Sequence, residues 1–458
     1  MLLQELHGHK LGVCVSGGLD SRTVTKRLIA AGCDVACFVA DLGQPDESDI
    51  DDVRVRMEAT GAPCTIVDLR AEMAEACFAT IAAQATYDGG YWNTTGLARA
   101  VTVRGLLAAM RAQGCSVLVH GATGRGNDQI RFERYTNVLA PSMHVYAPWR
   151  DPELLAEFPG RTQMAAYLQA HGLEAKVVRK RYSTDANLAG LSHEAEDLED
   201  VETSCLIVDP VMCVWPQQAP DVLRDVTLRF EHGRCVAIDG VAMAPLPLMQ
   251  LANAIGGAAG IGLANALENR IIGTKSRGVY EAPGMELLGT GLRAIYQAVL
   301  DRRASGLFAQ MSRLLADATY DGRLYDPAPR AAQACIDVLS AHASGTVVLG
   351  LYKGHAFVQA IRECAATLYN PADASMEASD GLNPTSSQGF VEIQRCEAVA
   401  LARAGQISLP PSLPPALPPS RRGAEHPHVV ATDLEHLGRP AVVVGETDVD
   451  APHTSIAS

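Results

Sequence analysis

The chain has 458 residues, a formal net charge of −14 and an apolar fraction of 48%, with 20% of its residues charged. This length is enough for two or three domains, and this composition is that of an ordinary globular protein. The acidic balance argues against a nucleic-acid partner, which requires clustered lysine and arginine, and no segment approaches the roughly 20 apolar residues that span a membrane.

The 12 cysteines are scattered, several of them inside apolar runs (Cys14, Cys37 and Cys115), and no C-x-x-C pair occurs. This pattern predicts buried, reduced thiols in a cytoplasmic protein rather than a metal or redox site held by cysteine. The first seven residues lack a basic segment followed by an apolar one, so no signal peptide is expected.

The first 150 residues alternate short β-rich runs with longer helical stretches. Strands are predicted over residues 12–15, 35–40, 64–68, 116–120 and 144–147, and helices over residues 21–31, 48–60, 72–86 and 96–113. This alternation predicts an α/β domain with a parallel sheet covered by helices on both faces. The ligands of such a sheet bind beyond the C-terminal ends of its strands.

Residues 16–21 (SGGLDS) join the first predicted strand to the first predicted helix. A strand, a glycine-rich turn and a helix N-terminus make an anion site, because glycine lets backbone N–H groups close around phosphate oxygens. The kinase-type loop G-x-x-x-x-G-K-[ST] is absent. Residues 40–44 (ADLGQ) and 121–128 (GATGRGND) also follow predicted strands, so the three segments are expected to meet on one edge of the sheet.

A second region follows Pro148–Pro152. It contains a predicted hairpin over 226–231 and 234–238, helix-like stretches over 247–255 and 287–320, and an amphipathic helix over 389–403. From Leu409 the chain is rich in proline, which predicts a solvated, disordered tail; a proline-rich ligand for a partner is the alternative. The domains are assigned to residues 1–160, 161–395, 396–408 (a C-terminal helix) and 409–458 (the tail).

Several separated motifs together resemble the argininosuccinate synthase family. Residues 16–21 match the SGG-x-D-[ST] phosphate loop of ATP pyrophosphatases, and residues 120–133 and 275–281 follow in the family order. The resemblance runs from about residue 11 to about residue 403. It implies an α/β nucleotide-binding domain of the HUP type (adenine nucleotide alpha hydrolase-like), an α+β synthetase and multimerisation domain, ATP with Mg²⁺, and a homotetramer.

In that family ATP adenylates the ureido oxygen of citrulline, and the amine of aspartate then displaces AMP. The resemblance places the following residues at ATP: Cys14, Val15, Ser16, Gly17, Gly18, Leu19, Asp20, Ser21, Arg22, Ala40 and Gly121. It places Thr123, Asn127 and Asp128 at aspartate. It places the following residues at citrulline or an analogue: Tyr91, Asn127, Arg131, Ser183, Ser192, Glu268 and Tyr280. Catalytic roles are expected for Ser16, Asp20, Asp128 and Arg131.

The acceptor side departs from the family pattern. The family stretch Leu-Leu-Gly-Thr-Ser-x-Ala-Arg-Pro reads WNTTGLARA over residues 92–100, so Gly96 replaces a serine expected at citrulline. Leu263 and Asn265 replace an arginine and an aspartate, and all three changes are expected to alter the citrulline pocket. Glu268 has a purely structural alternative, as a partner of Arg270 or Arg277.

Two other functions stay open beside the argininosuccinate synthase reaction. The first is the same chemistry on a different ureido or amide acceptor in specialised metabolism. The second is a catalytically weak homologue that only binds nucleotide or partners. The intact polar residues of 16–21 and 121–128 argue against the second, because polar groups in an empty site are costly to keep.

Overall fold

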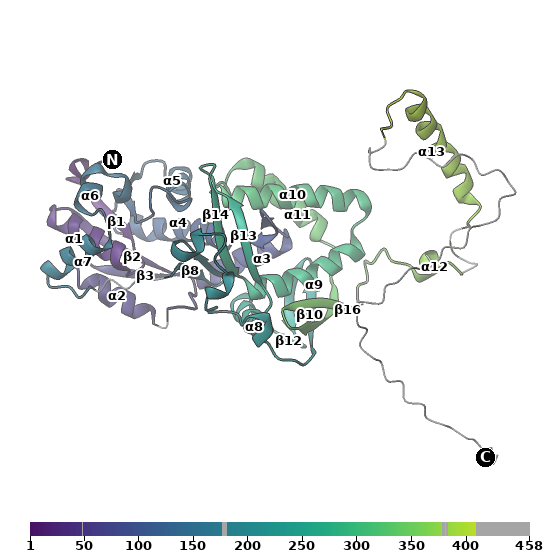
Figure 1. The fold of residues 1–458 in the computed structure, drawn as a ribbon, viewed down its shortest axis with the longest axis horizontal. Helices are drawn as coiled ribbons and strands as arrows, with labels where there is room; N and C mark the ends of the chain where they lie inside the picture. The colour runs from purple at the N-terminus through teal and green to yellow at the C-terminus, as the bar shows by residue number, and fades with distance from the viewer. Residues whose placement is uncertain (48, 176–180, 378–380, 382, 409–458) are drawn as a thin grey trace, which may run out of the picture. The chain divides into compact units, whose positions relative to one another are not determined.

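The computed structural model describes residues 1–47, 49–175, 181–377, 381 and 383–408 (Figure 1). The chain separates into two units at residue 375, and each is described by itself. The tail predicted over 409–458 lies outside the described residues. Within them, no helix combines the length and the apolar character needed to cross a membrane.

The N-terminal half contains the predicted parallel sheet, with strand order β3-β2-β1-β6-β7. Its strands are β1 (Lys10–Cys14), β2 (Asp34–Asp41), β3 (Cys64–Asp68), β6 (Val117–His120) and β7 (His144–Tyr146). Val13 in the central strand pairs with Cys37 on one side and Val119 on the other, and all three are buried. The predicted parallel architecture is therefore confirmed.

Helices surround this sheet. They are η1 (Leu3–Leu6), α1 (Leu19–Ala30), α2 (Ile50–Glu58), α3 (Arg70–Ala82), α4 (Thr94–Ala112), α5 (Asp128–Leu139), η2 (Pro148–Arg150), α6 (Pro152–Glu157) and α7 (Arg161–Ala170). The helix predicted over 72–86 ends earlier, at Ala82. A short hairpin follows, made of β4 (Thr86–Tyr87) and β5 (Tyr91–Trp92), with Gly89 and Gly90 at its turn in left-handed conformations. The sequence reasoning missed this hairpin.

Two antiparallel sheets form the C-terminal half of the first unit. The first has the order β13-β14-β9-β8 and consists of β8 (Ser183–Asn187), β9 (Gly190–Glu194), β13 (Leu263–Asn269) and β14 (Lys275–Glu281). The second has the order β12-β11-β10-β15-β16 and consists of β10 (Arg224–Glu231), β11 (Arg234–Ile238), β12 (Val241–Ala242), β15 (Gly345–Tyr352) and β16 (His355–Arg362). The predicted hairpin is β10–β11.

The helices of this half are η3 (Glu196–Glu199), η4 (Cys205–Ile207), η5 (Pro216–Gln218), α8 (Pro245–Ala258), α9 (Pro283–Val299), α10 (Arg302–Tyr320), α11 (Pro327–Ser340) and α12 (Pro371–Ala374). The stretch predicted over 287–320 is therefore two helices. Asp301 separates them, because its side chain accepts hydrogen bonds from the backbone N–H groups of Arg303 and Ala304 and so caps α10.

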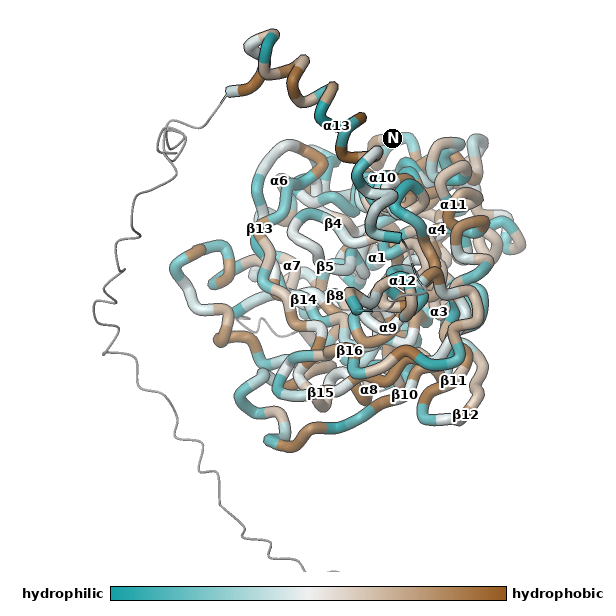
Figure 2. The backbone as a smooth tube through the Cα atoms, turned by 90° about the vertical axis from the view of Figure 1, so that its right-hand side faces the viewer, coloured by the Kyte–Doolittle hydropathy of each residue, from teal (hydrophilic) through white to brown (hydrophobic). Residues whose placement is uncertain are grey.

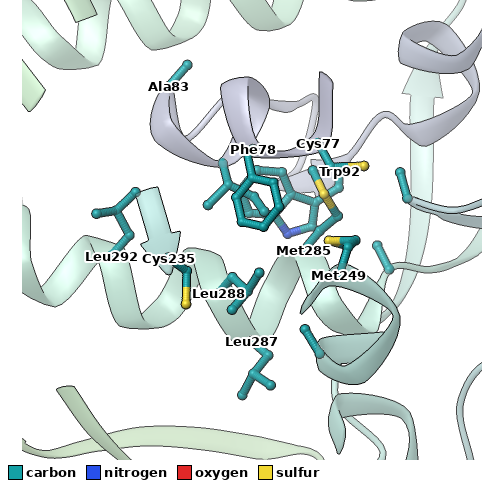
Figure 3. Close-up of a cluster of buried hydrophobic side chains, with 14 of the residues drawn as sticks. Cys77, Phe78, Ala83, Trp92, Cys235, Met249, Met285, Leu287, Leu288 and Leu292 are labelled. Atoms are coloured by element: carbon teal, nitrogen blue, oxygen red, sulfur yellow. The ribbon is translucent and has the colours of Figure 1, made fainter. Parts of the chain in front are cut away.

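One hydrophobic core joins the two halves. Phe78 of α3 and Trp92 of β5 pack with Met285 and Leu288 of α9 and Met249 of α8 (Figure 3). The Trp92 indole also donates a hydrogen bond of 2.8 Å to the Glu286 carboxylate. This shared core joins the C-terminal half to the N-terminal half, and Figure 1 shows β13 and β14 between the parallel sheet and helices α10 and α11.

The second unit contains one described helix, α13 (Ser386–Arg403). It covers the helix predicted over 389–403, whereas Ala404–Ser408 follow it without helical structure, so the segment predicted as helix over 396–408 is only partly helical. Apolar residues such as Phe390 and Ile393 alternate with polar ones along α13 (Figure 2).

Candidate active site

A cavity of about 850 Å³ lies where the C-terminal ends of the parallel strands face the β8–β9–β13–β14 sheet. Sixteen of the 20 predicted site residues line it: Cys14, Val15, Ser16, Asp20, Ser21, Ala40, Tyr91, Gly121, Thr123, Asn127, Asp128, Arg131, Ser183, Ser192, Glu268 and Tyr280. Gly17, Gly18, Leu19 and Arg22 are not among its lining residues. One cavity thus gathers residues from positions 14 to 280 of the chain.

The phosphate loop closes on itself at the N-terminus of α1. The Ser16 backbone N–H donates to Ser21 Oγ at 3.2 Å, and the two serine hydroxyls lie 3.2 Å apart. Gly17 has φ +72°, and a Cβ there would meet a Val53 methyl group at 2.9 Å, so only glycine fits. Gly18 at the N-cap position makes no side-chain cap. The first N–H groups of α1 are therefore left for an anion.

Two charged side chains of this loop behave differently. The Asp20 carboxyl lines the cavity, and burial raises its pKa against the opposing charge of Arg161, a cavity residue of α7 that the sequence reasoning did not single out. Arg22 instead points toward the segment that follows α7, where its guanidinium donates to the Glu174 carbonyl oxygen at 2.7 Å.

The loop after β2 is held by its own side chains. Gln44 donates to the Ala40 carbonyl oxygen at 2.9 Å and accepts from the Leu42 backbone N–H at 2.8 Å. Across the cavity, a Cβ added at Gly121 would meet no atom within 4 Å. Ala40 and Gly121 thus border open space at the ends of β2 and β6, the two strands that flank β1, which suits a flat ligand such as a nucleotide base or ribose.

An ion-pair cluster stands at the start of α5. Asp128 accepts from Arg99 Nε and Arg131 Nη1, each at 2.9 Å, and Arg99 also pairs with Asp185. Burial alone raises the pKa of the Asp128 carboxyl, but the two guanidinium groups outweigh it and hold the pKa below its ordinary value. Burial raises the pKa of Asp185, against the opposing charge of Arg99. Neither Arg99 nor Asp185 was predicted as a site residue.

Three tyrosine hydroxyls surround the Glu268 carboxylate, which is buried. Tyr91 and Tyr280 donate to its Oε2, the latter at 3.2 Å, and Tyr320 donates to Oε1 at 2.8 Å. The rings of Tyr91 and Tyr280 stack with their centroids 4.1 Å apart. The alternative expectation, that Glu268 pairs with Arg270 or Arg277, is wrong. Among the described contacts, Arg270 donates to Ser276 and Arg277 donates to Asn265.

Tyr320 links this cage, the three tyrosine hydroxyls around Glu268, to α5, although Tyr320 lies 189 residues after Arg131 in the sequence. The Tyr320 hydroxyl accepts from Asn127 Nδ2 at 2.8 Å, and its backbone carbonyl oxygen accepts from Arg131 Nε at 2.8 Å. The Arg131 guanidinium also lies 4.9 Å from the centroid of the Tyr320 ring. Asn127 and Arg131 therefore meet on one side of the first turn of α5, as their spacing predicts.

The β8–β9–β14 face supplies the remaining acceptor-side residues. Ser192 pairs with Asp185 on one side and with Tyr280 on the other, and Ser183 pairs with Glu194. Behind the sheet, the fully buried Glu281 accepts from His193 and from the backbone N–H groups of residues 211–213 at 2.7 to 2.9 Å. The Glu281 carboxylate thereby holds residues 211–213 against β9 and β14, the strands that carry Ser192 and Tyr280.

The expectation that three substitutions alter the citrulline pocket directly is wrong. Gly96 is not a lining residue; a Cβ there would stand 2.6 Å from Asn93 Nδ2 and 2.9 Å from the Thr319 carbonyl oxygen. Leu263 and Asn265 are five and three residues before Glu268 on β13. Because these spacings are odd, their side chains lie on the face of the strand opposite to that of Glu268. Asn93 and Thr95 line the cavity near Gly96 instead.

Comparison with known proteins identifies the two halves of the chain. The family model described as "Arginosuccinate synthase N-terminal HUP domain" matches residues 10–174, and "Arginosuccinate synthase C-terminal domain" matches residues 182–400. The chain is similar to argininosuccinate synthase of Nitratidesulfovibrio vulgaris, with 38% identity over 388 residues, covering 84% of this chain and 96% of the relative. It is 36% identical over 395 residues to argininosuccinate synthase of Thermotoga petrophila, covering 84% and 95% of the two chains.

Proposed function

Because this chain belongs to the argininosuccinate synthase family of carbon–nitrogen ligases, we propose that it joins citrulline to aspartate with the cleavage of ATP to AMP and pyrophosphate. The observation that carries this proposal is the single cavity. It joins a phosphate loop, an arginine–aspartate cluster and a tyrosine-caged carboxylate.

In the first step, the backbone donors of residues 16–21 and the N-terminus of α1 hold the phosphates of ATP. The ureido oxygen of citrulline forms a bond to the α-phosphorus, and the bond to pyrophosphate breaks. Charge builds up on phosphate oxygens, so catalysis consists of positioning and electrostatic stabilisation. Ser16 and Ser21 add hydroxyl donors at this end of the cavity.

Mg²⁺ fits this site as a partner of the nucleotide. The described residues contain no group of three or more His, Cys, Asp or Glu side chains that could hold a metal alone. Mg²⁺ ordinarily combines one or two carboxylates with substrate phosphates and water. Asp20 lines the cavity beside the phosphate loop and would be that carboxylate. The bound ion would neutralise charge on the phosphates.

In the second step, aspartate binds near Thr123, Asn127 and Asp128. Two arginines already neutralise Asp128, so its carboxylate orients Arg99 and Arg131 toward the anionic substrates. The acceptor side, where citrulline would bind, is formed by Arg131, Tyr91, Tyr280, Glu268, Ser183 and Ser192. Assembly as a homotetramer and a cytoplasmic location remain predictions.

Pyrophosphate release with ATP, aspartate and a panel of ureido and amide compounds tests the proposal. We expect release to depend on citrulline and on aspartate, with argininosuccinate and AMP in equal amounts. Release with another acceptor but not with citrulline would favour the alternative ligase. ATP binding with no release for any acceptor would contradict the proposal and favour a weak nucleotide-binding homologue.

A further inference from the structure

Glu194 lines the acceptor side of the cavity, although it was not predicted as a site residue. It ends β9, where it pairs with Ser183 of β8 on one side and Gly278 of β14 on the other. Ser192 lies two residues earlier on the same strand and so faces the same side of the sheet. Gly278 has no side chain to cover Glu194, and the carboxylate lines the cavity.

Glu194 differs from three other carboxylates on this side of the cavity, and also from the neighbouring lining residue Glu196, which is exposed. Glu268 is bound by three tyrosine hydroxyls, Asp128 by two arginines and Asp185 by one. The Glu194 carboxylate has no hydrogen-bond or ion-pair partner among the residues that the structure describes. Its carboxylate is therefore available to a proton on a substrate, whereas Glu268, Asp128 and Asp185 are engaged by the protein.

The surroundings of Glu194 favour its protonated form. The titratable and charged groups around it are Glu268 on β13, Tyr280 on β14, Asp128 on α5, Asp185 on β8, Arg270 beyond β13 and Glu196 at the start of η3. Burial raises the pKa of the Glu194 carboxyl to about 7, the carboxylates on β13, α5 and β8 add to the rise, and Arg270 opposes it. A base is most effective when its pKa lies near the working pH.

We propose that Glu194 is the general base that takes a proton from the ammonium group of aspartate before this nitrogen attacks the adenylated acceptor. The inference rests on the proposed function and adds a residue to its second step. An ammonium group has no lone pair, so the second step requires a proton acceptor. Glu194 lines the cavity with the acceptor-side residues, and it is near enough to Asp128 of the proposed aspartate site for that carboxylate to raise its pKa.

The atoms and electrons of this step balance without a further reactant. The aspartate ammonium gives one proton to the Glu194 carboxylate. The freed lone pair forms a nitrogen–carbon bond to the central carbon of the ureido group, which is adenylated on its oxygen and protonated on nitrogen. The carbon–oxygen bond to AMP breaks, and its electron pair leaves on the AMP oxygen. The attacking nitrogen gives its second surplus proton to the departing phosphate, which leaves a guanidinium group.

Glu194→Gln separates the two steps. It retains the size of the side chain but cannot take up the proton. We expect citrulline-dependent exchange of labelled pyrophosphate into ATP, which needs only the first step, to stay within about threefold of wild type. Formation of argininosuccinate from aspartate should fall by about 10²-fold or more. Glu199→Gln, an exposed residue of η3 outside the cavity, is the matched control and should change neither rate.

The pH profile distinguishes a base from a merely structural carboxylate. In wild type, the rate of the aspartate step should rise as the pH increases through about 7, because Glu194 must be deprotonated to accept a proton. Glu194→Gln should lose this rise at its lower rate, and Glu194→Asp should retain it with a reduced rate, because a shorter carboxylate still takes up the proton.

The outcomes tell the two proposals apart. If wild type shows no citrulline-dependent exchange and makes no argininosuccinate, the proposed function fails and the role of Glu194 falls with it. If wild type shows both activities and Glu194→Gln forms argininosuccinate at the wild-type rate with an unchanged pH profile, only the role of Glu194 is overturned. Equal losses of exchange and of product formation would also overturn it, because they would indicate a binding or structural role.

Discussion

The nucleotide side and the acceptor side of the cavity are built in different ways. The nucleotide side comes from the loops after β1, β2 and β6, and its donors are backbone N–H groups and short hydroxyls around open space. The acceptor side comes from α4, α5, the five strands β5, β8, β9, β13 and β14, and the end of α10, and most of its charged and tyrosine side chains are already bonded to one another. The first is a backbone cradle that a ligand fills, whereas the second is a preorganised side-chain network.

This difference predicts that substitutions on the two sides fail differently. On the nucleotide side, side chains contribute to ligand binding but little to folding. On the acceptor side, each partner removed leaves another buried polar or charged group unpaired, which costs stability as well as activity. The following variants test this contrast, from the largest expected effect to the smallest.

Asp128→Asn should have the largest effect on stability. It leaves Arg99 and Arg131 without their shared anion, and breaking such a buried pair costs about 3 kcal/mol. Glu58→Gln, which breaks the exposed Arg54 pair on α2, is the control and should cost under about 1 kcal/mol. Urea unfolding measures both. Equal, small losses for the two variants would contradict the contrast.

The pH dependence of the Asp128 effect has a definite sign. The folded-state pKa of Asp128 is lowered, so its contribution to stability is fully present above its unfolded-state pKa and is lost as the pH falls through the folded-state value. The difference in unfolding free energy between wild type and Asp128→Asn should therefore shrink in acid. A constant difference between pH 7 and pH 2 would show that the charge of Asp128 is not the cause.

Asp20→Asn should show the opposite combination. We expect at least a hundredfold loss of pyrophosphate release, because the side chain lines the cavity beside the loop at which we propose that the phosphates bind, with a melting temperature that is unchanged or slightly higher. Burial raises the pKa of Asp20, which means that the folded protein disfavours its charge, so a neutral amide removes a cost. Asp52→Asn on the exposed side of α2 is the control. Full activity in Asp20→Asn would make the loop purely structural.

Gly96→Ser restores the family serine, but the structure leaves no room for it. The added Cβ would lie 2.6 Å from the Asn93 amide nitrogen and 2.9 Å from the Thr319 carbonyl oxygen. We expect a loss of about 1–3 kcal/mol in stability and no gain in citrulline affinity. Gly306→Ser on α10, where a Cβ meets nothing within 4 Å, should be tolerated. Tighter citrulline binding by Gly96→Ser would refute this packing argument.

Ala195→Gly should produce the smallest effect, and in the stabilising direction. Ala195 follows Glu194 with φ +66° and ψ −178°, a conformation that is easy only for glycine. Glycine should raise the unfolding free energy by about 1 kcal/mol, whereas Ala59→Gly at the ordinary helical end of α2 should lower it slightly. A melting temperature reduced by Ala195→Gly would show that the backbone is not strained there.

The same contrast explains what the sequence could predict. The phosphate loop is local: strand, glycines and helix N-terminus follow one another, so the chain itself displays the site. Tyr320 was missed because its partners Asn127 and Glu268 lie 193 and 52 residues away, and only the packing of α10 brings them together. Arg99 was within a recognised motif, and its position there was a usable signal. Gly96 was misjudged because motif position reveals neither backbone approach nor the neighbouring Asn93 amide.

The fate of one oxygen atom tests the central claim most directly, namely that the ureido group and ATP react in this one cavity. Citrulline labelled with ¹⁸O in its ureido group is incubated with the enzyme, ATP and aspartate, and the products are analysed by mass spectrometry. In the proposed reaction the ureido oxygen attacks the α-phosphorus and leaves with AMP, so we predict one ¹⁸O atom in the phosphate of each AMP and none in pyrophosphate. Unlabelled AMP, or formation of ADP in place of AMP, would contradict the account.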